Sequence, residues 1–235
     1  MTRWGASAQV GVGLRTFIVC ACLTGIPLGA ADPRGILAKM DAAATSFRGV
    51  SATLNKVSHT AVINDDSRES GSMRMLRQDK TVQVLLEFAE PDVRSMAFRD
   101  RKVEIYYPKI QTVQEYDLGK FGNLVDQFML LGFGTPGREL AASYKVRVVG
   151  EDAVAEQRTV RIELVPKSSK VLEHLKKAEL WISESGGYPI QQKFYQSSGD
   201  HTTITYTNVQ RNPELDAESV RLKLPKGVKR EYPQR

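Results

Sequence analysis

The sequence predicts a mainly β protein with a few helices, built around one large antiparallel sheet. From about residue 72 onward, apolar residues alternate with polar ones, which is the period of half-buried strands. Turn-forming residues separate these runs at hairpin spacing, and most successive strands have no helix between them. The chain has no repeat of fixed period and no low-complexity linker, so we expect a single domain over residues 32–235.

Residues 1–31 have the pattern of a cleaved secretory signal peptide. Arg3 and Arg15 precede an apolar run at 16–28, and small residues follow at 29–31. The apolar run has about thirteen residues, whereas a helix that crosses a bilayer needs about twenty. We therefore expect the leader to be removed and the remaining chain to work in the periplasm.

Both cysteines of the chain, Cys20 and Cys22, lie in this leader. The mature chain would therefore have no disulfide and no thiol nucleophile. Two alternatives retain part of the leader: a permanent N-terminal anchor, or lipoprotein processing that keeps Cys22 as a lipidated first residue.

The mature chain is mildly basic. The full chain has a formal net charge of +6, and the leader contributes two arginines and no acid, which leaves +4. Charges of both signs are interspersed, without the basic stripe or the aromatic and basic platform of nucleic-acid binders. We expect no nucleic-acid partner.

A helix is predicted at the start of the mature chain. Asp32 is expected as its N-cap and Pro33 in its first turn. Apolar residues recur at three- and four-residue spacing on one stripe: Ile36, Leu37, Met40, Ala44 and Phe47.

Strands follow in two groups. The first group is predicted at 72–76, 82–88, 96–98 and 103–107, with turns at 64–66, 78–80, 91–92 and 100–101. The second group is predicted at 144–149, 159–165, 178–183, 190–195, 202–209 and 220–224, with a hairpin turn at 185–187.

Two helical pieces are expected between these groups. The shorter covers 137–143. The longer is LGKFGNLVDQFMLLGFG at 118–134, and we call it the lid segment. Its apolar stripe covers most of its circumference, so it must be covered on several sides or must itself cover an apolar surface. The stripe consists of Phe121, Leu124, Val125, Phe128, Met129, Leu130 and Leu131.

Gly132, Gly134 and Gly137 have the G-x-G-x-x-G spacing of a dinucleotide-binding turn. That motif requires a strand before the first glycine and a long helix after the third. Here a helical pattern precedes the glycines, and Pro136 interrupts them. We interpret the spacing as a glycine-rich exit from an apolar helix and expect no nucleotide or other cofactor.

Catalytic signals are also weak. His59, His174 and His201 lie far apart in the sequence and have no ligand partner at helical spacing, so we expect no metal site. No G-x-S-x-G nucleophile motif is present. We expect a binding protein and not an enzyme.

Several segments, in their order and spacing, resemble the outer-membrane lipoprotein carrier (LolA) family of lipoprotein-sorting proteins. They are GSMRMLR at 71–77, the run from Glu87 to Leu118, VDQFMLLGFG at 125–134, ELVPK at 163–167 and the close at 215–229. The resemblance covers nearly the whole mature chain. It implies an unclosed, strongly curved antiparallel β-barrel, or half-barrel, with a helical lid over an apolar cavity.

The resemblance also implies a function. It implies a periplasmic chaperone that shields the acyl chains of lipoproteins, and we expect this chain to be a monomer. The chaperone would receive this cargo from an inner-membrane lipoprotein-releasing transporter and pass it to an outer-membrane receptor. Two alternatives remain open: a carrier or sensor of another amphiphile such as a glycolipid, and a regulatory module of the same fold that transports nothing.

Alternation and resemblance together predict an acyl-binding site, in which unbranched methionines suit irregular lipid tails. The alternative is an ordinary apolar core. The sheet would contribute Met73, Met75, Val82, Val84, Leu86, Met96, Phe98 and Ile105, and the lid segment Leu124, Phe128 and Met129.

The family resemblance also places an inward-pointing arginine at the end of the strand that follows a glycine. Counted from Gly71, that position is Arg77, which alternation puts on the face of Met73 and Met75. Gln78 stands where the family has proline, and the family's tryptophan in the next strand is absent. We expect Arg77 to weaken cargo binding and to hydrogen-bond the lid when the cavity is empty. The alternative is an exposed arginine at a strand end.

Overall fold

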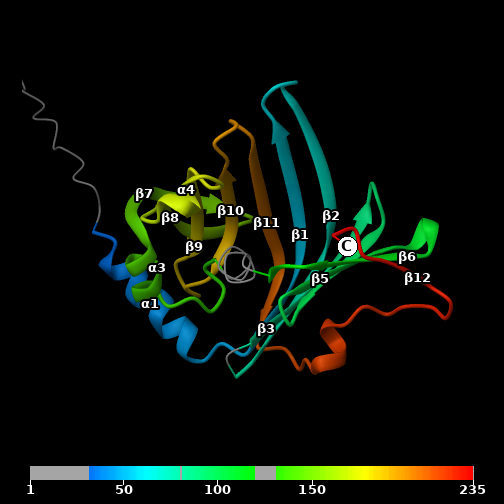
Figure 1. Cartoon of the computed structure of the whole chain (residues 1–235). Coiled ribbons are helices and arrows are strands. Elements are labelled where there is room, and N and C mark those ends of the chain that lie inside the picture. The colour runs from blue at the N-terminus through cyan, green and yellow to red at the C-terminus, as the bar shows by residue number, and fades with distance from the viewer. Residues whose placement is uncertain (1–31, 80, 120–130, 235) are drawn as a thin grey trace, which may run out of the picture.

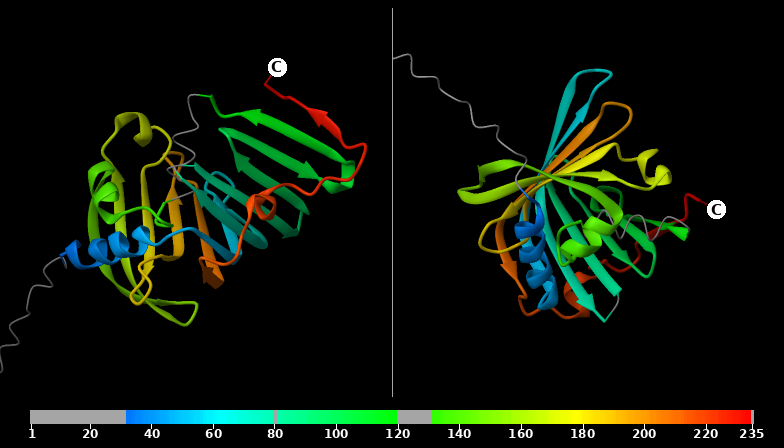
Figure 2. Two further views of the ribbon diagram at one scale, coloured as in Figure 1. Left: turned by 90° about the horizontal axis from the view of Figure 1, so that it is seen from below. Right: turned by 90° about the vertical axis from the view of Figure 1, so that its left-hand side faces the viewer.

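A computed structural model describes residues 32–79, 81–119 and 131–234 of the chain. Its twelve strands form one sheet in the order β12-β6-β5-β4-β3-β2-β1-β11-β10-β9-β8-β7. All neighbouring strands are antiparallel except the short β12, which pairs parallel with β6. The sheet is strongly curved, and β12 and β7 are its two edges, so the barrel is not closed (Figures 1 and 2). The expected half-barrel fold class is confirmed.

The strands are β1 Gly49–Thr60, β2 Asp65–Gln78, β3 Thr81–Glu90, β4 Arg94–Arg99, β5 Lys102–Tyr107, β6 Thr112–Asp117, β7 Tyr144–Val154, β8 Gln157–Pro166, β9 Lys177–Ser183, β10 Pro189–Tyr195, β11 His201–Arg211 and β12 Lys229–Glu231. The α-helices are α1 Arg34–Thr45, α3 Gly137–Ser143 and α4 Ser169–Leu172. The 3₁₀ turns are η1 Pro108–Ile110 and η3 Ala217–Val220.

The predicted first helix is present as α1 and begins one residue later than expected. Its N-cap is Pro33 and not Asp32 as predicted, although the Asp32 carboxylate accepts a hydrogen bond from the Arg34 backbone N–H at 3.0 Å. Ile36, Met40 and Ala44 are its buried residues. Phe47 lies beyond the helix end and is also buried.

One predicted strand is wrong and three strands were not predicted. Residues 220–224 do not form a strand, because the chain turns at η3, where Asp216 and Ser219 cap each other. The Asp216 carboxylate accepts from the Ser219 backbone N–H at 2.8 Å, and the Ser219 hydroxyl accepts from the Asp216 backbone N–H at 3.3 Å. The strands that were not predicted are β1, β6 and β12.

The two faces of the sheet are covered differently. We call the face that carries Val50, Met75 and Val84 the inner face and the opposite one the outer face. On the outer face, the C-terminal segment packs over β2–β4, and its residues cluster with those of the strands: Leu76, Leu85, Ala97, Leu215, Val220 and Leu222. This segment therefore covers part of the outer face.

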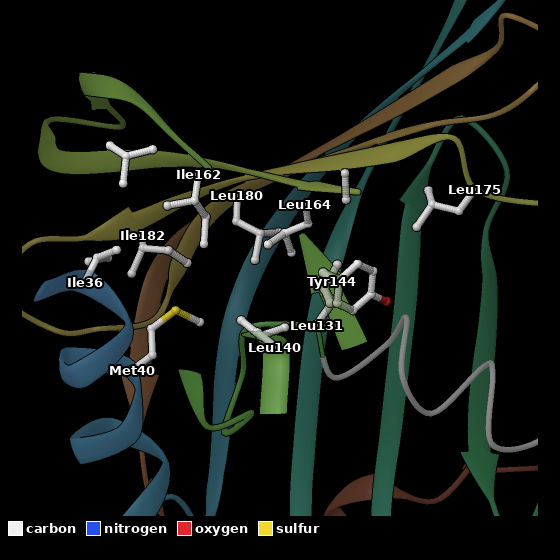
Figure 3. Packing of buried hydrophobic residues seen from close by; sticks show 12 residues of the cluster. Ile36, Met40, Leu131, Leu140, Tyr144, Ile162, Leu164, Leu175, Leu180 and Ile182 are labelled. Carbon is white, nitrogen blue, oxygen red and sulfur yellow. The ribbon is translucent and has the colours of Figure 1, made fainter. Parts of the chain in front are cut away.

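Helices α1 and α3 cover only one end of the inner face. Ile36 and Met40 of α1 and Leu140 of α3 pack against inner-face residues of β8 and β9 (Figure 3), namely Ile162, Leu164, Leu180 and Ile182. These helices leave the inner face of β1–β5, β10 and β11 to be covered by other groups, and the candidate site lies there.

Candidate functional site

The strand register places four predicted site residues in one row across the inner face. Met73 of β2 is opposite Leu86 of β3, which is opposite Met96 of β4, which is opposite Ile105 of β5. Directly opposed side chains on one face of a sheet are close neighbours. The alternation read from the sequence thus produces a continuous apolar row over four strands.

This row forms one wall of a cavity of about 480 Å³. The opposite wall comes from β10, β11 and the residues just before β9. A volume of this size lies within the range of roughly 300–1,000 Å³ found for small-molecule sites. The apolar lining is Leu54, Met73, Leu86, Phe88, Met96, Phe98, Ile105, Leu175, Phe194, Ile204 and Tyr206, and the polar lining is Lys56, Arg94, His174, Gln192 and Gln196.

The predicted site residues divide into three groups. Met73, Leu86, Met96, Phe98 and Ile105 line the cavity. Met75, Val84 and Val82 do not line the cavity: the first two are buried in the apolar cluster that also contains Met73, and Val82 packs against it. The lid residues Leu124, Phe128 and Met129 lie outside the described residues. That any of these residues binds lipid stays a prediction.

Residues 131–134, at the end of the lid segment, enter the inner face beside the cavity, and we call them the plug. Phe133 is 1% exposed and meets the Tyr206 ring edge-on, with 5.0 Å between the ring centres. The Leu131 carbonyl accepts a hydrogen bond from Gln192 Nε2, and Gln192 Oε1 accepts one from the Tyr206 hydroxyl at 2.7 Å. The plug is therefore held by both packing and buried hydrogen bonds.

Sequence reasoning did not single out Phe133, Gln192 or Tyr206. Tyr206 and Gln192 fall on the inner-face alternation of predicted strands, so a signal for them was present. Phe133 carried no such signal, because it lies between two glycines and belongs to neither a helical nor a strand period.

The plug explains the glycine spacing. Gly134 has a φ of +63°, and a Cβ there would lie 2.3 Å from Cδ1 of Phe47 and 2.9 Å from a guanidinium nitrogen of Arg77. A Cβ on Gly137 would lie 2.2 Å from the Leu37 carbonyl oxygen, where α3 crosses α1. Close packing at these positions leaves no room for a side chain, and this explains Gly134 and Gly137 without a phosphate ligand.

Arg77 reaches the plug from the end of β2. One of its guanidinium nitrogens donates to the Gly134 carbonyl at 2.8 Å, and the guanidinium lies 5.1 Å from the centre of the Phe47 ring. Burial lowers the pKa of Arg77, and the nearby Glu139 opposes this effect. The side chain thus points inward and contacts the end of the lid segment, as expected. It does not line the cavity itself.

At another part of the cavity wall, three charged side chains form a linked group. Lys56 Nζ lies 2.8 Å from Glu69 Oε2, and the Arg94 guanidinium bonds the other carboxylate oxygen of Glu69. Arg94 also stacks over the Phe88 ring at 4.4 Å. Burial would raise the pKa of Glu69, but the hydrogen bonds from Lys56 and Arg94 outweigh it and hold that pKa below its usual range. Sequence reasoning did not single out this group.

Two of the three histidines, which lie far apart in the sequence, meet in space. His59 and His201 are opposite each other in the β1–β11 register and stack with 4.6 Å between ring centres. His59 Nδ1 also lies 2.8 Å from Asp66 Oδ1. In the described ranges, no three His, Cys, Asp or Glu side chains gather as metal ligands would.

No helix within residues 32–79, 81–119 or 131–234 combines the length and the apolar character needed to cross a membrane.

Comparison with known proteins gives structural matches alone. No protein-family model and no curated protein matches the sequence. The structure of MucB matches with a TM-score of 0.52 at 17% identity over 83% of this chain. An uncharacterized conserved protein from Thermus thermophilus matches with a TM-score of 0.50 at 13% identity, covering 85% of this chain and 98% of that protein. This chain spans 64% of the MucB chain, which is less than two thirds of its length.

A LolA superfamily protein from Nitrosomonas europaea also matches, with a TM-score of 0.40 at 12% identity over 82% of this chain and 99% of that protein. The fold of this chain is a curved, unclosed antiparallel sheet with helices on its inner face, and it is similar to the fold of MucB. Identities this low concern the fold and leave the ligand and the partners to be argued from the cavity.

Proposed function

We propose that this protein is a periplasmic carrier that shields the acyl chains of lipoproteins between the inner and the outer membrane. The observation that supports this most is the cavity of about 480 Å³ on the inner face, whose lining is mainly apolar. In this proposal the protein works after removal of residues 1–31, as a binding protein without enzymatic activity. An inner-membrane transporter supplies its cargo and an outer-membrane receptor accepts it.

The energetics of lipid transfer favour a cavity of moderate affinity. Each buried methylene contributes about 0.8 kcal/mol, so one long acyl chain carries about 10 kcal/mol. Three such chains would exceed the limit of roughly 20 kcal/mol that non-covalent complexes reach. A carrier must therefore cover the chains and still release them, which requires an element that competes with the cargo for the inner face.

The plug is suited to that competition. Phe133 occupies the inner face next to the cavity and is held by Tyr206, while Arg77 holds the Gly134 carbonyl. In the proposed cycle, the entering acyl chain takes the place of Phe133 and the plug moves aside. On delivery the plug returns, and the contacts that it regains offset part of the cost of releasing the chain.

Mass spectrometry of organic extracts tests this proposal. Protein isolated from its native periplasm should carry acylated N-terminal segments of lipoproteins. The variant Ile105→Trp, which fills the cavity, should lose this lipid, and Tyr106→Trp, on the other face of the same strand, should keep it.

The other outcomes separate the alternatives. Recovery of a glycolipid would replace lipoproteins by another amphiphile as cargo. Absence of any acyl species, together with no binding of an added fatty acid, would overturn the carrier proposal in favour of a regulatory module.

A further inference from the structure

The cavity has a charged part, and it is basic. The ionisable side chains that line the cavity are Lys56, Arg94, His174 and Tyr206, and no aspartate or glutamate of the described residues is among them. An apolar hollow with cations gathered in its wall complements a molecule that joins an apolar chain to an anionic group.

The strand register builds this basic part. Lys56 of β1 is opposite Glu69 of β2, and Arg94 of β4 is opposite Phe88 of β3. Glu69 bridges the two cations from the same face of the sheet, and only the two cations are among the residues that line the cavity. The cations therefore face the ligand space while their carboxylate partner fixes their positions.

These groups keep donors for a ligand. A lysine ammonium has three N–H groups, and Lys56 gives one to Glu69. A guanidinium has five N–H groups. Arg94 donates one to the Glu69 carboxylate and one, at 3.4 Å, to the Asp92 carbonyl. One carboxylate faces two cations, so the group has a net positive charge.

Partial burial strengthens the electrostatic interaction of this group with a charged ligand. The side chains of Lys56, Glu69 and Arg94 are 28%, 13% and 19% exposed. Water screens such groups less than it screens a fully exposed pair, and a charged ligand that enters the cavity would interact with them at a lower effective dielectric constant. Because burial of a cation is costly, this arrangement is unusual for an ordinary apolar core.

We propose that the cargo is an anionic amphiphile, whose acyl chain fills the apolar cavity and whose carboxylate or phosphate group binds Lys56 and Arg94. The inference rests on the proposed carrier function and narrows the cargo to acylated molecules that carry an anionic group beside the chain. His174, on the opposite wall, contributes a further polar contact to the headgroup. The apolar row from Met73 to Ile105 takes the chain.

Binding of amphiphiles that share one hexadecyl chain tests this inference. The mature chain is titrated with palmitate, hexadecyl phosphate, hexadecanol and hexadecyltrimethylammonium, each below its critical micelle concentration. We expect one or both of the anionic probes to bind about tenfold more tightly than the alcohol, as for a charge-assisted hydrogen bond, and the cationic probe to bind most weakly. The preference should fall as salt is added. The two anionic probes distinguish a carboxylate from a phosphate headgroup.

Variants of the charged group separate ligand binding from a structural role. Lys56→Gln and Arg94→Gln should each weaken anionic-probe binding by about tenfold and leave hexadecanol binding unchanged. Glu69→Gln should strengthen anionic-probe binding, because it removes the competing carboxylate. A group that only stabilised the fold would lose binding of every probe in all three variants. Lys145→Gln, at an exposed position on β7, is the matched control and should change nothing.

The outcomes distinguish the two proposals. Equal binding of charged and neutral probes, or no effect of Lys56→Gln and Arg94→Gln on the anionic probes, would overturn the headgroup inference and leave the acyl cavity standing. Absence of binding of all four probes would overturn the carrier proposal itself.

Discussion

Arg77 connects the sheet to the plug through a single carbonyl. Its guanidinium donates to Gly134 and stacks on Phe47, and a half-buried cation at this place costs desolvation. That cost is offset while the plug is seated. In the proposed cycle, Arg77 loses this acceptor when the plug moves aside, so we expect Arg77 to favour the empty state.

This role predicts the effect of Arg77→Leu. The variant should bind acylated cargo more tightly, because a cation that disfavours the chain becomes apolar, and it should pass cargo on more slowly. Transfer of a fluorescent fatty acid from the protein to acceptor vesicles measures both quantities. Arg68→Leu, at an exposed position on the same strand, is the control. An Arg77→Leu variant with the transfer rate of the unaltered protein would show that this arginine has no part in release.

At the residue scale, strand alternation was enough to predict which side chains point inward. Met73, Leu86, Met96 and Ile105 were placed correctly on one face because the side-chain period of a strand is two. Alternation could not distinguish the inward residues that pack in the core from those that line the cavity. Met75 and Val84 have the same pattern as Met73 and Leu86, yet only Met73 and Leu86 line the cavity. Met75 and Val84 are buried in the cluster that Phe133 of the plug joins.

At the scale of elements, the plug covers the part of the inner face that lies beside the cavity. It adds Phe133 to an apolar cluster that already contains Phe47, Met75 and Tyr206. The Gln192 side chain fixes its other end by bonding the Leu131 carbonyl. The proposed cycle requires that these contacts break while the rest of the sheet stays folded.

Phe133→Ala tests this view of the plug. Loss of a buried aromatic side chain should lower the free energy of unfolding by about 3–5 kcal/mol. Palmitate should restore more stability to this variant than it adds to the unaltered protein, because the vacated space lies against Tyr206, which lines the cavity. Urea unfolding with and without palmitate provides the measurement.

The control for this variant is Leu85→Ala, which removes a buried side chain on the outer face. It should also lose stability, by about 2–5 kcal/mol, and gain no more from palmitate than the unaltered protein does. An equal gain in both variants would mean that the ligand does not occupy the space of Phe133.

Local sequence signals were most reliable for elements whose structure depends mainly on residues within the element itself. The first helix, the hairpin turns and the Gly137–Ser143 helix follow from caps, spacing and turn residues. The segment at 220–224 has strand-like alternation, and the structure instead packs it on the outer face after a capped 3₁₀ turn. Its partner surface, the outer face of β2–β4, is made by residues far away in sequence, so no local pattern could reveal this packing.

At the scale of the whole molecule, the covering of the two faces directs a ligand to one side. The C-terminal segment packs over the outer face of β2–β4, and α1 with α3 covers the β8–β9 end of the inner face. Among the described residues, none that lines the cavity belongs to either cover. The sheet's curvature turns this part of the inner face into a hollow, and a flat sheet with the same sequence pattern would have exposed it to water. Periodicity carries no information on curvature, so the half-barrel shape was predicted by family resemblance alone.

The central claim is that an acyl chain occupies the inner-face cavity, and paramagnetic broadening of methyl signals by a nitroxide-bearing fatty acid measures it most directly. The nitroxide is carried by the fatty acid, so the broadening reports where the ligand lies. We expect strong broadening for Leu54, Ile105 and Ile204, which line the cavity, and none for Leu215 and Leu222 on the outer face. Broadening confined to the outer-face residues, or equal broadening on both faces, would contradict the account.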